Sequence, residues 1–163
     1  MTAPHLEPTI SISSSGRTDG LGRRELYFDR ETGDMLERLH ARPEIALFET
    51  AIRERIEQLA GFNDPRFARV RTAERLDGSL TVLSDFIPGQ TLADLFDAAR
   101  DLSIVPGLDA ALGYLVEGLY AVAALHRGAG GAHGLIAPER TLFTADGGLV
   151  FLDAPYSTTI DRL

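Results

Sequence analysis

The chain has 163 residues, of which 44% are hydrophobic, enough to bury one ordinary core but not two independent ones. Its 24 acidic and 16 basic residues give a formal net charge of −8, which argues against a surface for nucleic acid or anionic membranes, because such surfaces need clustered Lys and Arg. The absence of cysteine excludes disulfides and thiolate metal sites, and the four histidines lack the spacing of metal ligands.

The N-terminal part is predicted as a tail followed by a small sheet. Residues 1–15 carry two prolines and a serine cluster, which predict a mobile tail with at most a strand around residues 9–12. A glycine-rich turn at residues 16–22 comes next, and residues 25–29 and 35–40 are predicted as two strands joined by a turn. They indicate a small antiparallel sheet.

A single helix is predicted over residues 43–60. Apolar residues recur there at helical spacing, among them Ile45 and Ile52, with charged residues on the other side. Pro43 suits the first position of a helix, and Gly61 suits the position after its end. The helix therefore follows directly on the predicted sheet.

Residues 67–76 and 79–86 are predicted as the two strands of a hairpin. The Asp77-Gly78 pair between them is a two-residue turn signal, because both positions tolerate a positive φ. A Pro88-Gly89 pair then interrupts regular structure.

Two further helices are predicted. Thr91 and Asp94 have the spacing of a capping box, which indicates a helix over about residues 92–100. Asp109 is expected to cap a longer helix that ends near Arg127 and a group of glycines. Apolar residues spread around nearly the whole circumference of this helix, so we expect burial on most of its sides.

A loop and a second hairpin complete the chain. The loop spans residues 131–140, and the strands cover residues 141–145 and 149–153, with a turn at residues 146–148. Loops held by rigid elements are favoured places for functional sites. This loop is therefore the first place to look for one.

The loop and hairpin resemble a known family. The run from His133 to Leu142, followed by Val150-Phe-Leu-Asp153, is similar to the catalytic and metal-binding loops of protein kinases. The order of elements from the glycine turn onward resembles bacterial serine/threonine kinases. The resemblance implies an α+β protein with a kinase-like fold, in which a small antiparallel-sheet lobe with one helix precedes a truncated helical large lobe.

The resemblance also implies boundaries. The tail of residues 1–15 would precede a small lobe of residues 16–86, a hinge at residues 85–89 and a partial large lobe from about residue 90 to residue 163. A kinase large lobe continues for many helices past its metal-binding loop. We therefore expect a protein partner, or the missing remainder of the large lobe, to cover the long helix.

By the same resemblance, the glycine turn and the hinge would bind a nucleotide. Gly20 and Gly22 match the glycine-rich loop of the family, and residues 84–89 match its hinge. The nucleotide-binding residues would then be Gly20, Gly22, Asp85 and Ile87, and the cofactors ATP and magnesium.

The catalytic loop departs from the family pattern. The Asp that orients the substrate hydroxyl, the Lys that steadies the phosphate and the Asn that holds magnesium fall on Leu135, Ala137 and Arg140. His133 remains and is expected to be a packed scaffold residue. Asp153 remains as the candidate metal ligand, although a single carboxylate is a poor magnesium site.

The nucleotide-binding elements depart as well. Arg17 and Asp19 stand where the family has its first two glycines, so an acidic side chain would face the nucleotide. The strand that should carry the phosphate-binding Lys has Glu37 or Leu39 at that place, with Arg38 as a neighbouring substitute. ATP and magnesium binding are therefore expected to be weak or absent.

Two other charged positions complete the comparison. The helix residue that should be the partner Glu of the missing Lys falls on Arg55, and Arg140 is expected to form a solvated pair with Glu139. We predict a pseudokinase, a catalytically inactive regulatory or interaction module. The alternatives are an ATP-dependent serine/threonine kinase with atypical catalytic residues and a degenerate relative of small-molecule phosphotransferases, whose loop also begins with His-Gly.

The sequence shows no apolar run that approaches the roughly 18 to 20 residues needed to cross a bilayer, and no charged-then-apolar signal pattern at its start. We therefore expect a cytoplasmic protein without a membrane segment, and the resemblance to bacterial serine/threonine kinases implies a bacterial signalling protein.

Overall fold

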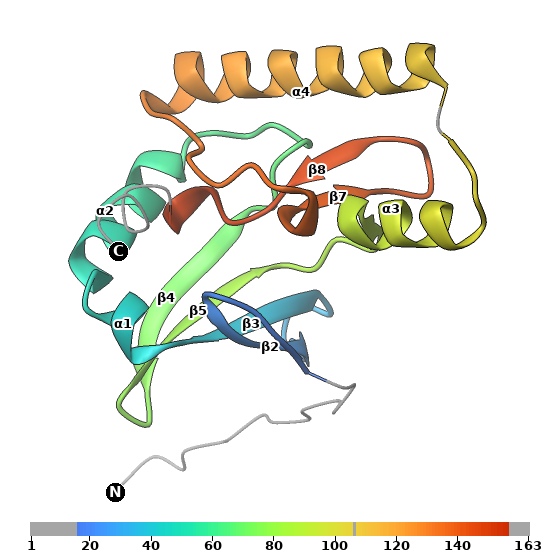
Figure 1. Cartoon of the computed structure of the whole chain (residues 1–163). Coiled ribbons are helices and arrows are strands. Elements are labelled where there is room, and N and C mark those ends of the chain that lie inside the picture. Colours follow the sequence, from blue (N-terminus) through green and yellow to red (C-terminus); the bar gives the residue numbers. More distant parts are fainter. Residues whose placement is uncertain (1–15, 106, 157–163) are drawn as a thin grey trace, which may run out of the picture. The chain divides into compact units, whose positions relative to one another are not determined.

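The computed structural model describes residues 16–105 and 107–156, which belong to two compact units (Figure 1). The first, the sheet unit, comprises the described residues up to Leu47 together with Arg71–Phe86. The second, the helical unit, comprises Phe48–Val70 and the described residues from Ile87 onward. The division at Phe86 falls within the expected hinge. The predicted tail and its strand at residues 9–12 lie outside the described residues.

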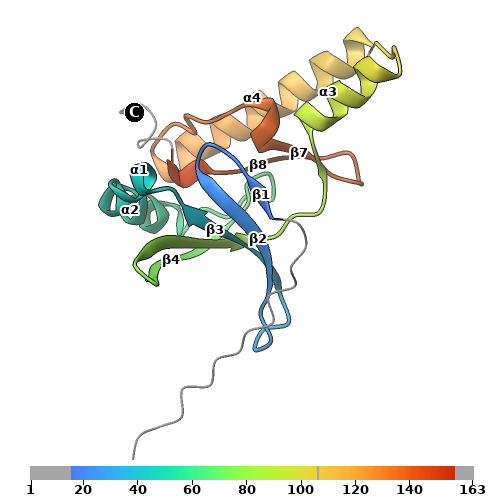
Figure 2. The same ribbon diagram turned by 60° about the horizontal axis from the view of Figure 1, so that its bottom comes forward.

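The sheet unit is built on a five-stranded antiparallel arrangement in the order β1-β2-β3-β5-β4, of which Figure 2 labels β1, β2, β3 and β4. The strands are, in chain order, β1 Arg17–Thr18, β2 Gly22–Phe28, β3 Met35–Ala41, β4 Val70–Leu76 and β5 Ser79–Asp85. The predicted strands at residues 25–29 and 35–40 are confirmed, and β3 lies in the centre, between β2 and β5.

The turn between β4 and β5 confirms the predicted hairpin. Asp77 and Gly78 both have positive φ, 51° and 80°, which is the geometry of the turn that matches strand twist. The first strand begins at Val70 and not at residue 67 as predicted. The reason is that the amide of Ala68 donates to the carbonyl of Phe151 at 3.1 Å, so this part of the chain is drawn into the helical unit.

The predicted continuous helix over residues 43–60 is wrong. The structure has a short helix α1, Pro43–Ala46, and a separate helix α2, Glu49–Leu59, because Phe48 leaves the helical region with φ −101° and ψ 19°. The break coincides with the boundary between the units. Ile45 is buried in the sheet unit and Ile52 in the helical unit, whereas one straight helix would turn both residues to one side.

The helical unit combines α2 with two further helices, α3 Leu92–Asp101 and α4 Leu108–Ala129, and with a three-stranded sheet. The strands are β6 Gln90–Thr91, β7 Thr141–Phe143 and β8 Leu149–Phe151, and short 3-10 turns cover Pro138–Arg140 and Ala154–Tyr156. Figure 1 shows α4 running along one side of the β7 and β8 hairpin. The hydrophobic core of the helical unit includes Phe67, Ala121, Leu125 and Phe151.

Capping decides where the helices begin. The hydroxyl of Thr91 accepts from the amide of Asp94 at 3.1 Å, which confirms the predicted start of α3. Asp109 does not cap α4, since Gly107 holds that position and Asp109 lies in the first turn. Gly130 ends α4 in the left-handed region at φ 64°, a conformation that glycine adopts without strain.

The helix α4 corrects one further expectation. Among the described residues, Leu108–Ala129 is one helix that is long and apolar enough to span a membrane by length and composition alone, and 11% of its most apolar window is buried. The statement that the chain has no apolar segment of that length was therefore wrong. The expectation of burial on most sides of α4 is not met within the described residues.

Candidate functional site

The imidazole of His133 is enclosed in the loop that follows α4. It is fully buried, and its ring lies 5.9 Å from that of Phe67 and 6.0 Å from that of Phe151. The Nδ1 atom accepts a hydrogen bond from the amide of Leu135 at 3.3 Å. Burial lowers the pKa of His133 from 6.5 to about 4, against a smaller opposing effect of Asp153. The ring is therefore neutral near pH 7 and braces the loop, in agreement with its expected scaffold role.

Two degenerate catalytic positions lie in the same loop. Leu135 offers the loop its backbone amide, and its aliphatic side chain has no group that can accept a proton. The carbonyl of Ala137 accepts from the hydroxyl of Thr141 at 3.0 Å and from the amide of Arg140 at 2.9 Å. Both residues shape the turn that leads into β7.

A buried ion pair lies beside this turn. The guanidinium Nη1 of Arg140 is 2.5 Å from the carboxylate Oδ2 of Asp153, and the two side chains are 15% and 5% exposed. The carbonyl of Arg140 accepts from the amide of Leu152 at 2.9 Å, which ties the two segments together. Asp153 itself has φ 68°, a left-handed conformation that Asp tolerates better than bulkier residues. The expected solvated pair of Arg140 with Glu139 was wrong.

In the sheet unit, the glycine turn is closed by its own acidic residue. The carboxylate Oδ1 of Asp19 accepts from the amides of Leu21 at 2.8 Å and of Gly22 at 3.2 Å. Its Oδ2 accepts from the guanidinium of Arg24 at 2.8 Å, and Arg24 also contacts Glu37 at 2.5 Å. Asp19 therefore contacts two amides of its own turn, and the expectation that it would face a nucleotide stays a prediction.

The residue that sequence reasoning missed is Arg24. Its side chain is 5% exposed and joins Asp19 to Glu37 within one group. The signal was present, because Arg24 stands two residues after Gly22, where the family signature has a valine. A charged residue between a glycine turn and a predicted strand indicates a partner across the sheet.

The positions proposed for the missing Lys have structural roles of their own. Leu39 is 2% exposed and belongs to the core, and Glu37 pairs with Arg24. Arg38 points to the opposite face of β3, since side chains alternate along a strand. There its guanidinium lies 4.2 Å above the ring of Tyr27 and 3.4 Å from Glu25.

Three of the four expected nucleotide residues, Gly22, Asp85 and Ile87, have structural contacts of their own. Gly22 is required for strand pairing, because a Cβ there would come within 2.0 Å of the carbonyl oxygen of His40. Gly20 lies in a bend between β1 and β2. Asp85 accepts from Arg71 at 2.5 Å in the sheet unit, whereas Ile87 packs against an apolar cluster in the helical unit. Their role toward a nucleotide stays a prediction.

The hydrogen bonds of Arg55 lie within the helical unit. It is 4% exposed, and its Nη1 donates to the carbonyl of Ala129 at 2.9 Å and to the side chain of Gln58 at 3.0 Å. Its Nη2 lies 3.5 Å from the carbonyl of Ala132. The guanidinium thus attaches α2 to the segment that follows α4.

Replacing Arg55 by methionine is expected to lower the free energy of unfolding by about 2 kcal/mol, because the backbone carbonyls of Ala129 and Ala132 lose a charged donor held by a buried side chain. Chemical denaturation measures the change. Arg53→Met, two residues along the same helix at a side chain 42% exposed, is the matched control and should cost less than about 0.5 kcal/mol. Equal losses for the two variants would show that Arg55 has no anchoring role.

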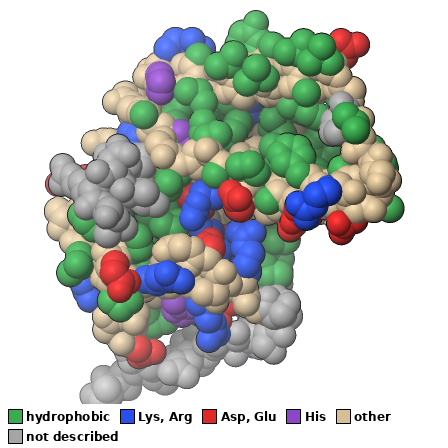
Figure 3. Space-filling model, in the orientation of Figure 1, with side chains coloured by type: hydrophobic (Ala, Val, Ile, Leu, Met, Phe, Trp, Pro, Cys, Tyr) green, Lys and Arg blue, Asp and Glu red, His purple; other side chains and the backbone are tan. Residues whose placement is uncertain are grey.

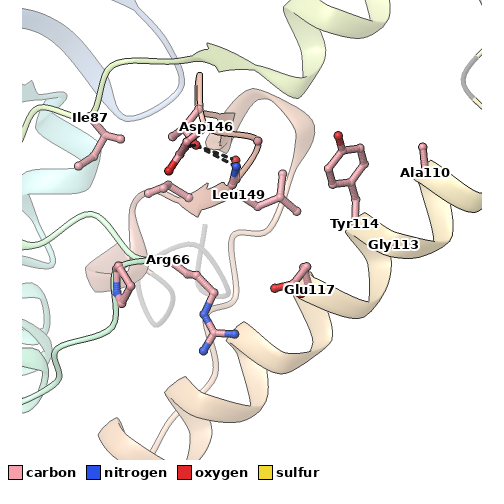
Figure 4. A pocket seen from close by; sticks show the side chains of 13 residues that line it. Arg66, Ile87, Ala110, Gly113, Tyr114, Glu117, Asp146 and Leu149 are labelled. Atoms are coloured by element: carbon pink, nitrogen blue, oxygen red, sulfur yellow. Dashed lines mark hydrogen bonds between the residues drawn. The ribbon is translucent and has the colours of Figure 1, made fainter.

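Two hollows accompany these loops in the helical unit. One, of about 730 Å³, lies between the first half of α4 and the turn between β7 and β8, and Figure 4 shows Tyr114, Glu117, Arg66 and Asp146 around it. Two of its charged groups have partners, since Arg66 binds Asp64 at 2.6 Å and Asp146 accepts from Thr144 at 2.5 Å. The other, of about 670 Å³, lies between α3 and α4 and is lined almost entirely by apolar side chains.

No group of three or more His, Cys, Asp or Glu side chains within residues 16–105 and 107–156 is arranged to hold a metal ion. Asp153 as a magnesium ligand stays a prediction. Its carboxylate contacts the guanidinium of Arg140, which supplies the positive charge that a metal ion would otherwise supply.

Comparisons with known proteins bear on the fold. No family model matches the chain, and no curated protein matches it. Among solved structures, it is similar to the crystal structure of the PknI kinase domain from Mycobacterium tuberculosis, a cysteine-to-alanine mutant, with a TM-score of 0.69 and 18% identity. The match covers 85% of this chain and 56% of that one. The fold is protein kinase-like.

The likeness confirms the expected α+β architecture, with an antiparallel sheet lobe and a helical part. At 18% identity it shows the fold alone, and the chain spans little more than half of the kinase domain that it matches. Activity therefore has to be argued from the residues of this kinase-like chain.

Proposed function

We propose that this chain is a catalytically inactive kinase-like module that acts in regulation or protein interaction. The observation that carries the proposal is the ion pair between Arg140 and Asp153. By the sequence resemblance, these residues stand where a kinase has the Asn and the Asp that hold magnesium. A guanidinium on the carboxylate neutralises its charge and contributes no oxygen ligand, whereas magnesium demands a nearly ideal set of oxygens.

The glycine turn supports the same proposal from the sheet unit. Phosphate groups bind to backbone amides that are free to donate, as in the glycine-rich loops of nucleotide-binding proteins. Here the amides of Leu21 and Gly22 donate to Asp19, and Arg24 lies against the same carboxylate. The carboxylate of Asp19 thus takes the place of a phosphate group at these amides, and a nucleotide would have to displace it.

The alternative of an active kinase requires a substitute for the missing Lys. Arg38 lies on the other face of β3, between Glu25 and Tyr27, so reaching the places of Glu37 or Leu39 would need a change of strand register. Leu135 has no group to orient a substrate hydroxyl, which weakens both the kinase and the phosphotransferase alternatives. The proposal retains the cytoplasmic, bacterial signalling context expected from the sequence.

The proposal predicts no magnesium-dependent binding of ATP and no phosphate transfer. Binding at 100 times the dissociation constant would stabilise the chain by about 2.7 kcal/mol, so a thermal shift assay with ATP at millimolar concentration detects it readily. We expect no shift with or without magnesium, and radiolabelled phosphate transfer equal to that of the Leu135→Arg control. A magnesium-dependent shift, or transfer above the control, would contradict the proposal.

A further inference from the structure

The helix α4 presents an apolar row to solvent. Its inner side carries the buried Ala121 and Leu125. On the opposite side, Leu112, Val116 and Leu119 are 49%, 46% and 62% exposed, and Ala123 continues the row. The steps of four, three and four residues along this row keep it on one face of the helix. Such spacing is typical of helices that pair with another helix.

The two ends of the row carry opposite charges. Asp109 lies in the first turn of α4, and His126 and Arg127 lie in the last. All three are exposed. Figure 3 shows hydrophobic side chains along this helix between acidic atoms at one end and basic atoms at the other. With 22 residues, the helix spans about 33 Å, so the charges are too far apart to interact within one chain.

This pattern is complementary to itself when one copy is reversed. If two such helices lie antiparallel, with the two-fold axis between Glu117 and Gly118, Leu112 faces Ala123 and Val116 faces Leu119. The same alignment brings Asp109 of one copy beside Arg127 of the other, at both ends. A parallel alignment would instead place Asp109 next to Asp109 and Arg127 next to Arg127, which is repulsive.

We propose that the exposed face of α4 binds the same face of a second copy of this chain, as an antiparallel two-fold pair. Helix dipoles also favour this orientation, because each positive end meets a negative one. The apolar row then forms the centre of the interface and the charge pairs its rim, the usual anatomy of a specific interface. The interface is independent of whether the chain binds nucleotide.

Charge reversal tests the orientation. Asp109→Arg and Arg127→Asp should each weaken self-association about tenfold, because two attractive contacts per dimer become repulsive, and the double reversal should restore it. Sedimentation equilibrium of the 163-residue chain gives the dissociation constant. Glu74→Arg, an equal charge change on an exposed residue of β4, is the control and should have no effect. A wild-type chain that stays monomeric, forms larger aggregates or loses nothing on single reversal overturns the proposal.

Cysteine cross-linking tests the alignment directly, because the chain has no cysteine of its own. Leu112→Cys and Ala123→Cys variants should remain single chains when each is oxidised alone and should join when mixed, whereas Leu119→Cys, near the two-fold axis, should cross-link by itself. Circular dichroism checks that each variant is folded. Cross-linking of Leu112→Cys alone would indicate a parallel pair and would overturn the antiparallel interface.

Discussion

An Arg140→Ala variant is expected to lose about 3 to 5 kcal/mol of unfolding free energy, because it removes one partner of a buried ion pair and leaves the other in the interior. Asp153 is 5% exposed at its side chain, so water cannot replace the guanidinium without a rearrangement of the loop. Urea denaturation followed by circular dichroism measures the loss. A drop of this size is a large share of the stability of an ordinary domain.

Arg100→Ala provides the matched control. Arg100 pairs with Asp97 at 2.8 Å on α3, but these side chains are 74% and 63% exposed, so the loss should stay below about 0.5 kcal/mol. The double variant Arg140→Met with Asp153→Asn removes both charges and should recover much of the stability. Losses that add across the double variant would mean that Arg140 and Asp153 do not act as a pair.

Lowering the pH from 8 to 5 is expected to cost about 2 kcal/mol of stability through His133 alone. The unfolded chain takes up a proton near pH 6.5, whereas burial holds the pKa of His133 in the folded chain at about 4. Protonation therefore favours the unfolded state between these values, and stability falls as the pH drops through that window. The full loss below pH 4 is roughly 3 kcal/mol, since each pKa unit corresponds to about 1.4 kcal/mol.

The pH range of the stability loss distinguishes the effect of His133 from that of the carboxylates. The pKa values of Asp64 and Glu25 are lowered in the folded chain, so the stability that they contribute is lost only below their ordinary values of 3.8 and 4.5. A His133→Gln variant should flatten the change in unfolding free energy between pH 8 and 5, and His126→Gln, at an exposed histidine of α4, should leave it unchanged. A titration of His133 near pH 6.5 by NMR would contradict the prediction.

Local sequence patterns predicted most of the secondary structure. The Asp77-Gly78 turn, the Thr91 cap and the glycine after α4 were predicted correctly because each depends on a few neighbouring residues. The helix at residues 43–60 was predicted as one element because its apolar spacing is continuous and no Gly or Pro follows Pro43 within it. Its break at Phe48 follows from the division into two units, which is a property of the whole fold.

The candidate site shows the same limit. The identities of Leu135, Ala137 and Arg140 indicated lost catalytic groups, and these identities can be read directly from the chain. Their contacts could not be predicted. Arg140 was expected beside its neighbour Glu139, and it lies instead against Asp153, 13 residues away. Arg24 was overlooked because its two partners, Asp19 and Glu37, come together only when β2 pairs with β3.

By itself, then, the sequence determined the order of the elements, the kinase-like fold and the absence of the usual catalytic side chains at the matched positions, since these depend on residue type and short-range spacing. Only the tertiary structure decided which charges neutralise one another and which apolar face remains in solvent. Ion pairs such as Arg140 with Asp153 depend on distances across the fold, and the exposure of α4 depends on what packs against it.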